Sequence, residues 1–250
     1  MESDPIILAI DAGNTRIKWG MHDGSAWRAS GAIETDHSPA LARAWEKAPA
    51  PQRAVACSVA GALVLADIEN ACARTGIALQ LVRSEASRLG VTNGYRDPTQ
   101  LGADRWAALV AAHHARAGHK LVVNVGTALT IDALAGDGRF LGGLIVPGPA
   151  LMRRSLDRGT AGLRLTEGEF HEFPGSTPDA ITTGSVQACS GAIGRLAAAM
   201  AGRGVAPEHI VLSGGAAGEI AAHLPIAFTL HENLVLDGLA LIARDTACPG

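Results

Sequence analysis

The sequence predicts an α/β fold made of two copies of one strand-rich unit. The prediction comes from two stretches, LAIDAGNTRIKWG from Leu8 and LVVNVGTALTIDAL from Leu121. Each has an apolar strand that ends near a polar residue, then a turn with Gly and Thr, then an alternating strand. Asp11 aligns with Asn124, which lies 124 − 11 = 113 residues later. A chance match is the alternative, because Gly-Thr is common after strands.

The remaining elements follow from local signals. Residues 6–10 are a continuous apolar run, typical of a buried central strand. Residues 16–21 and 26–33 flank the turn signal His22-Asp23-Gly24. Further strands are expected at 54–59, 77–82, 121–125, 129–134, 140–146 and 210–212, with helices at 39–47, 62–74, 103–117, 183–203 and 234–243. The expected domains are an N-terminal lobe of residues 1–117 and a C-terminal lobe of residues 118–250.

Composition excludes several function classes. The net charge of −3 and the lack of a Lys/Arg cluster argue against nucleic-acid binding. No apolar run approaches the ~20 residues that span a bilayer, and the acidic N-terminus does not resemble a signal peptide. The four cysteines lack metal or redox spacing, so reduced thiols in a cytoplasmic protein are expected. They are Cys57, Cys72, Cys189 and Cys248.

The two Gly-Thr turns are suited to binding phosphate. Small residues let backbone N–H groups approach an anion closely, and two facing turns would present two sets of them. Asp11, at a strand end, is suited to hold a hydrated Mg²⁺, with Asn14 and Thr15 as neutral donors beside it. The alternative is that Asp11 only caps its turn.

Five motifs in order resemble those of the type III pantothenate kinases: DAGNTRIK, GADR, VNVGTALTID, GGLIVPG and STPDAITTG. The resemblance runs from about residue 6 to residue 243. It implies the fold of the sugar kinase, actin and heat-shock chaperone superfamily. This fold has two duplicated ribonuclease-H-like (actin-like ATPase) domains, each a mixed sheet with helices, and an ATP cleft between them. It also implies a cytoplasmic homodimer that uses ATP to phosphorylate pantothenate to 4′-phosphopantothenate, the first step of coenzyme A biosynthesis.

The resemblance also implies phosphate-binding residues. In the first motif, Asp11 would bind Mg²⁺ together with ATP. The second motif would supply a further phosphate-binding turn. The implied residues are Gly13, Asn14, Thr15 and Lys18 in the first motif and Gly126, Thr127 and Ala128 in the second. Ser213-Gly214-Gly215 resembles the segment near adenine.

The GADR motif is the implied substrate motif, covering Gly102, Ala103, Asp104 and Arg105. Asp104 corresponds to the proposed catalytic base, which would accept the proton of a primary hydroxyl. From the residues alone, it could equally be a helix N-cap or the ion-pair partner of Arg105.

Arg105 would lie at the pantothenate site, although an exposed helix arginine is the alternative. Tyr95 in N-G-Y is similar to an aromatic pantothenate contact, and a packing role is its alternative. Thr177 matches a threonine that reaches the substrate across the dimer interface.

Two positions depart from the family pattern. Asn124 stands where the family has an aspartate that binds a monovalent cation, K⁺ or NH₄⁺. An amide oxygen can ligate K⁺ but carries no charge, so weaker cation binding or a changed requirement is expected. Ser176 stands where the family usually has asparagine before the dimer-crossing threonine. Two other functions remain open from the sequence: a non-catalytic regulator on the same fold, and an actin-fold phosphatase or ATPase that uses water as nucleophile.

Overall fold

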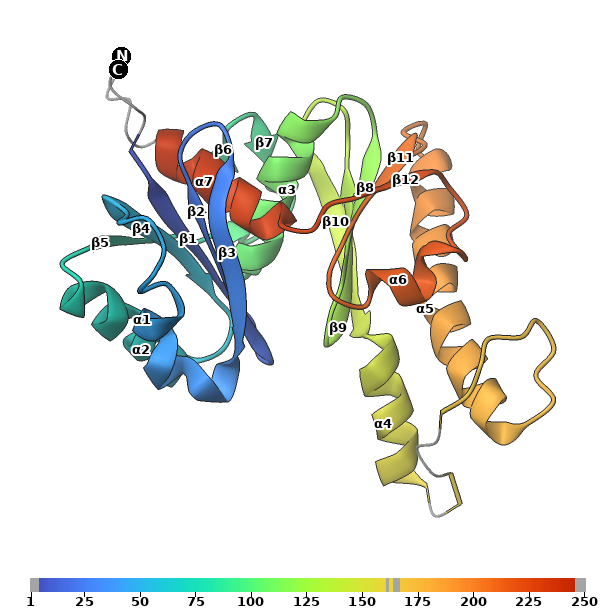
Figure 1. Ribbon diagram of the computed structural model, residues 1–250. Helices are drawn as coiled ribbons and strands as arrows, with labels where there is room; N and C mark the ends of the chain where they lie inside the picture. The colour runs from blue at the N-terminus through green and yellow to red at the C-terminus, as the bar shows by residue number, and fades with distance from the viewer. Residues whose placement is uncertain (1–4, 161, 164–166, 246–250) are drawn as a thin grey trace. The chain divides into compact units, whose positions relative to one another are not determined.

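The computed structural model describes residues 5–160, 162–163 and 167–245. They form two compact units: a first unit of residues 5–115 and 233–245, and a second unit of residues 116–232. Each unit is built on a five-stranded mixed sheet, in the order β3-β2-β1-β4-β5 or β10-β9-β8-β11-β12 (Figure 1). The matching strand orders confirm the predicted α/β fold with two mixed sheets.

The first unit is a sheet with helices on both faces. Its strands are β1 (Ile7–Ala12), β2 (Arg16–His22), β3 (Trp27–Glu34), β4 (Arg53–Ser58) and β5 (Ala78–Leu81), with a small hairpin of β6 (Ser87–Arg88) and β7 (Val91–Thr92). Its helices are η1 (Thr35–Ala40), α1 (Leu41–Ala44), α2 (Ala62–Arg74), η2 (Pro98–Gln100), α3 (Ala103–Ala115) and α7 (Leu234–Asp245). Leu8 and Ile10 of β1 pack with Trp45 and Ile68, so the α1 and α2 side of the sheet is an apolar core.

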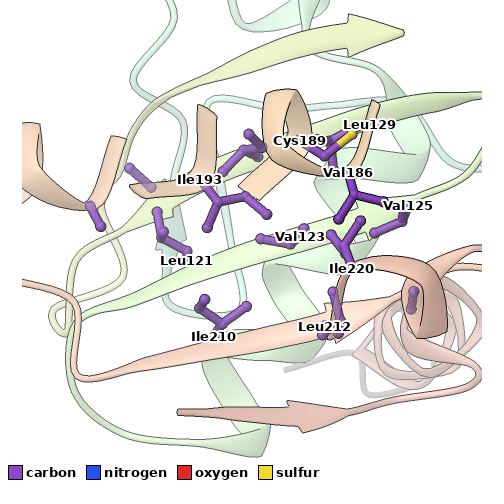
Figure 2. Packing of buried hydrophobic residues seen from close by; sticks show 14 of the residues in the cluster. Leu121, Val123, Val125, Leu129, Val186, Cys189, Ile193, Ile210, Leu212 and Ile220 are labelled. Atoms are coloured by element: carbon purple, nitrogen blue, oxygen red, sulfur yellow. The ribbon is translucent and has the colours of Figure 1, made fainter. Parts of the chain in front are cut away.

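The second unit repeats this plan. Its strands are β8 (Lys120–Val125), β9 (Ala128–Leu134), β10 (Phe140–Pro147), β11 (His209–Ser213) and β12 (Phe228–Leu230), and its helices are α4 (Pro149–Gly159), α5 (Thr177–Ala201) and α6 (Ala217–Ala221). Figure 2 shows α5 packed on this sheet through Val186, Cys189 and Ile193, which meet Val123 and Leu129. This core is also aliphatic.

Several elements differ from the sequence prediction. In place of the helix expected at residues 39–47, the structure has the 3-10 helix η1, which begins at Thr35 and contains Pro39, followed by the single turn of α1. Helix α4, which the sequence analysis did not expect, begins at Pro149, where the missing N–H of proline costs nothing. Helix α5 starts at Thr177, six residues before the predicted start at residue 183, since Ser176 caps it by accepting a bond from Asp179 N.

Helix α7 packs against the first unit, whereas the sequence prediction assigned residues 118–250 to one lobe. Trp27 Nε1 on β3 donates to Asp237 Oδ1 at 2.8 Å. A Cβ on Gly238 would lie 1.9 Å from the Ala107 carbonyl oxygen of α3, so glycine allows the two helices to touch. Buried apolar residues line α7 from Leu234 to Ala243. Burial of this apolar face against the first sheet explains why a helix late in the chain joins the first unit.

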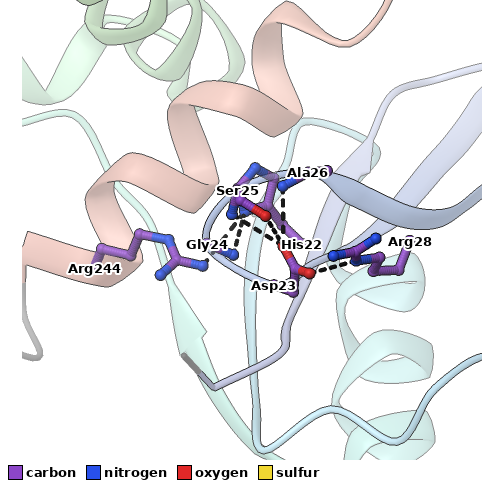
Figure 3. A network of polar contacts seen from close by, with 7 residues as sticks. All are labelled: His22, Asp23, Gly24, Ser25, Ala26, Arg28 and Arg244. Carbon is purple, nitrogen blue, oxygen red and sulfur yellow. Dashed lines mark hydrogen bonds and ion pairs between the residues drawn. The ribbon is translucent and has the colours of Figure 1, made fainter. Parts of the chain in front are cut away.

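A polar network also holds the end of α7 (Figure 3). His22 Nδ1 accepts from Gly24 N at 3.0 Å and faces Arg244 Nη2 at 3.3 Å. Asp23 caps the same turn by accepting from Ser25 and Ala26 N and is paired with Arg28. Burial, followed by the Arg244 charge, lowers the pKa of His22.

We expect the contribution of His22 and His209 to the unfolding free energy to fall as the pH drops below about 6.5. Burial, followed by the charges of Arg116 and His231, also lowers the pKa of His209, whose Nε2 lies 2.6 Å from Thr229 Oγ1. Since the unfolded chain takes up these protons first, acidification favours unfolding. Urea titrations at several pH values should show a smaller loss of unfolding free energy on acidification for a His22→Gln/His209→Gln variant than for the unsubstituted protein. Equal losses in the two proteins would contradict the assignment of this pH dependence to the two histidines.

Cys57, Cys72 and Cys189 are free and buried, as the sequence predicts, while Cys248 lies outside the described residues. Among the described helices, none combines the length and the apolar character needed to cross a membrane.

Candidate active site

Asp11 lies one residue before the carboxyl end of β1. In the sheet register it is opposite Lys18 on β2 and Cys57 on β4. Directly paired residues on neighbouring strands project from the same face. The three side chains therefore share the face opposite the one from which Leu8 and Ile10 enter the α1–α2 core.

The surroundings of Asp11 disfavour its negative charge. Burial, followed by the charge of Asp104, raises the pKa of Asp11 to about 6. The Cys57 thiol, whose Sγ donates to Asp11 Oδ1 at 3.5 Å, and the positive charge of Lys18 act in the opposite direction. Asp11 on β1 and Asp104 on α3 (Ala103–Ala115) are a suitable environment for a divalent cation, whose charge would offset both carboxylates.

The turn after β1 is compact and leaves polar side chains outside. Gly13 N donates to Arg16 O at 3.0 Å, and Gly13 O accepts from Thr35 Oγ1 at 2.8 Å. Asn14 and Thr15 at the tip are exposed. The turn thus has a hydrogen-bonded backbone and an exposed polar tip.

Asp104 lies in the first turn of α3, in the same unit as Asp11. Gly102, and not Asp104, is in the N-cap position, since Gly102 O accepts from Trp106 N at 2.9 Å. Asp104 Oδ1 instead accepts from the next backbone N–H, that of Arg105, at 2.8 Å. A Cβ at residue 102 would lie 2.6 Å from Asp104 Oδ1. Gly102 therefore leaves room for the Asp104 carboxylate, and the N-cap interpretation of Asp104 is wrong.

Arg105 is buried and not an exposed helix arginine, with 6% of its surface accessible. Its Nη1 donates to the Tyr95 hydroxyl at 3.1 Å, and its guanidinium carbon lies 5.8 Å from the centre of the Tyr95 ring. The loop that carries Tyr95 is fixed by Asn93, which accepts from Tyr95 N at 3.0 Å and donates to Pro98 O at 3.1 Å. The structure therefore brings two predicted substrate residues together.

In the second unit, Gly126 and Thr127 form the turn between β8 and β9. Gly126 N donates to Ala128 O at 3.0 Å, and all three residues are exposed. Gly148, at the N-cap of α4, donates its N–H to Thr127 O at 2.9 Å. A Cβ on Gly148 would lie 2.0 Å from Gly126 O, so the turn depends on glycine at residue 148.

Asn124 occupies the position in β8 that Asp11 occupies in β1. In the register it pairs with Ser213 on β11 and Thr130 on β9. Gly214, which follows Ser213, has a φ of 103°, and a Cβ there would lie 2.6 Å from Asn124 Oδ1. The Ser213-Gly214-Gly215 segment thus passes close to the Asn124 amide, which a larger residue at 214 would prevent.

Thr177 is exposed at the start of α5, in the second unit. The structure thus collects most predicted residues into two clusters, one per unit, and leaves Thr177 at a separate helix end. Sequence reasoning missed Cys57 and Asn93, and it gave no role to Gly148, which closes the GGLIVPG motif. Cys57 carries no local signal, because its neighbour Asp11 comes from another strand. Asn93 could have been found from its place in the N-G-Y turn.

Comparisons with known proteins identify the family. The family model described as "Type III pantothenate kinase" matches residues 7–199. The chain belongs to the type III pantothenate kinase family. A "Type III pantothenate kinase" of Nitrosospira multiformis is 43% identical over 98% of this chain and 93% of its own length. One of Aromatoleum aromaticum is 46% identical over 97% of this chain and 99% of its own length.

Solved structures agree on the fold. A ROK family glucokinase from Streptomyces griseus has a TM-score of 0.57 at 12% identity, covering 96% of this chain and 99% of its own. A ROK hexokinase from Thermus thermophilus has a TM-score of 0.52 at 17% identity, covering 97% and 100%. These similarities confirm the predicted kinase fold.

Family membership makes this protein a phosphotransferase that phosphorylates pantothenate in coenzyme A biosynthesis. The regulator and the phosphatase or ATPase, which the sequence alone left open, are the less supported alternatives.

Proposed function

We propose that this pantothenate kinase uses Asp104 as the general base and Asp11 to hold Mg²⁺ together with ATP. The observation that carries the proposal is the proximity of the two carboxylates, close enough for the Asp104 charge to raise the pKa of Asp11. They come from the end of β1 and the start of α3, so the fold brings together residues 93 positions apart (104 − 11).

The residues fit a magnesium–nucleotide complex better than a closed metal site. Among the described residues, no group of three or more His, Cys, Asp and Glu side chains could hold a metal ion. Mg²⁺ usually keeps several waters and is bound by one or two carboxylates plus substrate phosphates. When bound, the ion would neutralise charge on the phosphates. The turn residues Gly13, Asn14 and Thr15 would contact phosphate oxygens, as would Gly126 and Thr127.

Each proposed protein group has one task in the transfer. The primary hydroxyl of pantothenate loses its proton to Asp104 as its oxygen bonds to the γ-phosphorus and ADP leaves. Lys18 supplies positive charge beside Asp11. Arg105 and Tyr95 would orient the pantothenate, with the guanidinium paired to its carboxylate. Phosphoryl transfer depends mainly on such positioning and charge stabilisation.

We expect ADP release from ATP and Mg²⁺ to depend on pantothenate. A coupled assay with and without pantothenate measures this directly, and family membership leads us to expect rates of about 1–10³ s⁻¹. ADP release without pantothenate would indicate a phosphatase or ATPase instead. No release under any condition would favour the regulator.

The same assay tests whether Asn124 contributes to a site for a monovalent cation. An amide oxygen attracts a cation less than a carboxylate does. Replacing K⁺ with choline should therefore change the activity little. If K⁺ does activate the protein, half-maximal activation should need more K⁺ than in an Asn124→Asp variant. A lower K⁺ requirement for the parent protein than for Asn124→Asp would contradict this proposal.

We also propose a cytoplasmic homodimer in which Thr177 contacts the pantothenate bound by the partner. The exposed position of Thr177 at a capped helix start supports it. Light scattering during turnover measures the assembly, and an active monomer would contradict it.

A further inference from the structure

We infer that Cys57 is a positioning residue, whose thiol holds the Asp11 carboxylate in the orientation needed for Mg²⁺–ATP. The inference rests on the proposed function of Asp11 and adds a residue that none of the family motifs contains. It begins from the contact between Cys57 Sγ and Asp11 Oδ1, at 3.5 Å.

The backbone fixes this contact. Asp11 and Cys57 are direct partners in the parallel register of β1 and β4, two central strands of the first sheet. Paired residues of neighbouring strands project from the same face, so their side chains lie close together without a loop between them. Cys57 is 1% exposed and has little freedom to move away.

The thiol is suited to donate and not to react. Its Sγ lies within hydrogen-bond distance of Asp11 Oδ1 and can donate the thiol proton to that oxygen. A thiolate would instead repel the carboxylate, and the buried position limits access to oxidants.

The charge balance explains why Asp11 needs such a donor. Asp104 repels Asp11, while Cys57 and Lys18 oppose that repulsion. With Oδ1 engaged by Cys57, the plane of the carboxylate is fixed and the remaining oxygen can face the ligand. Without the thiol, the carboxylate could rotate away from Asp104, and the Mg²⁺–ATP complex would lose a positioned ligand.

The test compares two buried cysteines of the same unit. Cys72 on α2 is also 1% exposed, but it packs in the α1–α2 core on the other face of the sheet. Hydrogen bonds to charged groups usually contribute about tenfold or more to an equilibrium constant. Because a thiol is a weak donor, we expect Cys57→Ala to raise the KM for Mg²⁺–ATP by about three- to tenfold. The KM for pantothenate should change less. Cys72→Ala should leave both constants unchanged.

A conservative variant separates donation from packing. Cys57→Ser keeps a donor and should recover part of the loss, whereas Cys57→Val fills the space without a donor and should behave like Cys57→Ala. Thermal unfolding of every variant identifies losses due to stability alone.

An unchanged KM in Cys57→Ala, or equal KM values for the Ser and Val variants, would overturn the inference. If Asp11→Asn still impairs activity in that case, the proposed function stands without it. If Asp11→Asn has no effect, the proposed function fails first.

Discussion

Replacing Asp104 with asparagine is expected to lower kcat by about 10²- to 10⁴-fold, the usual contribution of a general base. An amide has the same shape as a carboxylate but cannot accept the hydroxyl proton. Asp104 Oδ1 accepts a bond from the adjacent Arg105 N–H, and the amide oxygen of asparagine can keep that bond. The fold should therefore tolerate the change.

The coupled ADP assay measures the loss, and calorimetric titration with ATP in the presence of Mg²⁺ measures nucleotide binding. We expect nucleotide binding to remain or to tighten, because the substitution removes a charge that repels Asp11. Asp137→Asn is the control, since Asp137 lies in an exposed turn of the second unit and pairs with Arg139. Undiminished turnover in Asp104→Asn would show that another group is the base.

Replacing Gly148 with alanine is expected to raise the KM for ATP about tenfold or more while the first unit stays intact. The new Cβ would lie 2.0 Å from Gly126 O and 3.0 Å from Thr127 O, and both atoms are backbone. Backbone cannot rotate away as a side chain can, so the turn or the start of α4 must shift. Overpacking of this kind costs about 1–3 kcal/mol, and here the shifted segment is the proposed phosphate turn.

Gly159→Ala is the matched control on the same helix. Gly159 ends α4 and has no atom within 4 Å of a built Cβ, so alanine should fit there. Steady-state kinetics against ATP and against pantothenate compare the two variants. If Gly148→Ala and Gly159→Ala had the same KM for ATP, the Gly126–Thr127 turn would not be a nucleotide contact.

Local patterns predicted much of the fold. The alternation of residues 16–21 and the continuous apolar runs ending near Asp11 and Asn124 predicted the strands that lie at the centre of each sheet. The repeated strand-turn-strand pattern predicted the duplication, because each copy carries its own hydrophobic periodicity and its own glycine turn. These signals lie within about 15 residues, so they can be read without knowing the fold.

In the candidate site, too, the sequence predicted some features and left others undecided. The motif around Asp104 could be found in the sequence, but its alternatives could not be separated there. Arg105 could equally have been exposed, and only the packing of α3 beside the Tyr95 loop buries it. The N-cap interpretation of Asp104 failed because α3 begins at Ala103, so Gly102 is in the N-cap position, two residues before Asp104.

The sequence by itself determined the two sheets, the turns that follow their central strands, and the family to which the motifs belong. Tertiary structure alone decided that Cys57 faces Asp11, that Gly148 supports the Gly126 turn, and that α7 joins the first unit. These contacts connect residues 22 to more than 200 positions apart in the chain. Their physical cause is the burial of apolar faces and the register of neighbouring strands, which a local pattern does not contain.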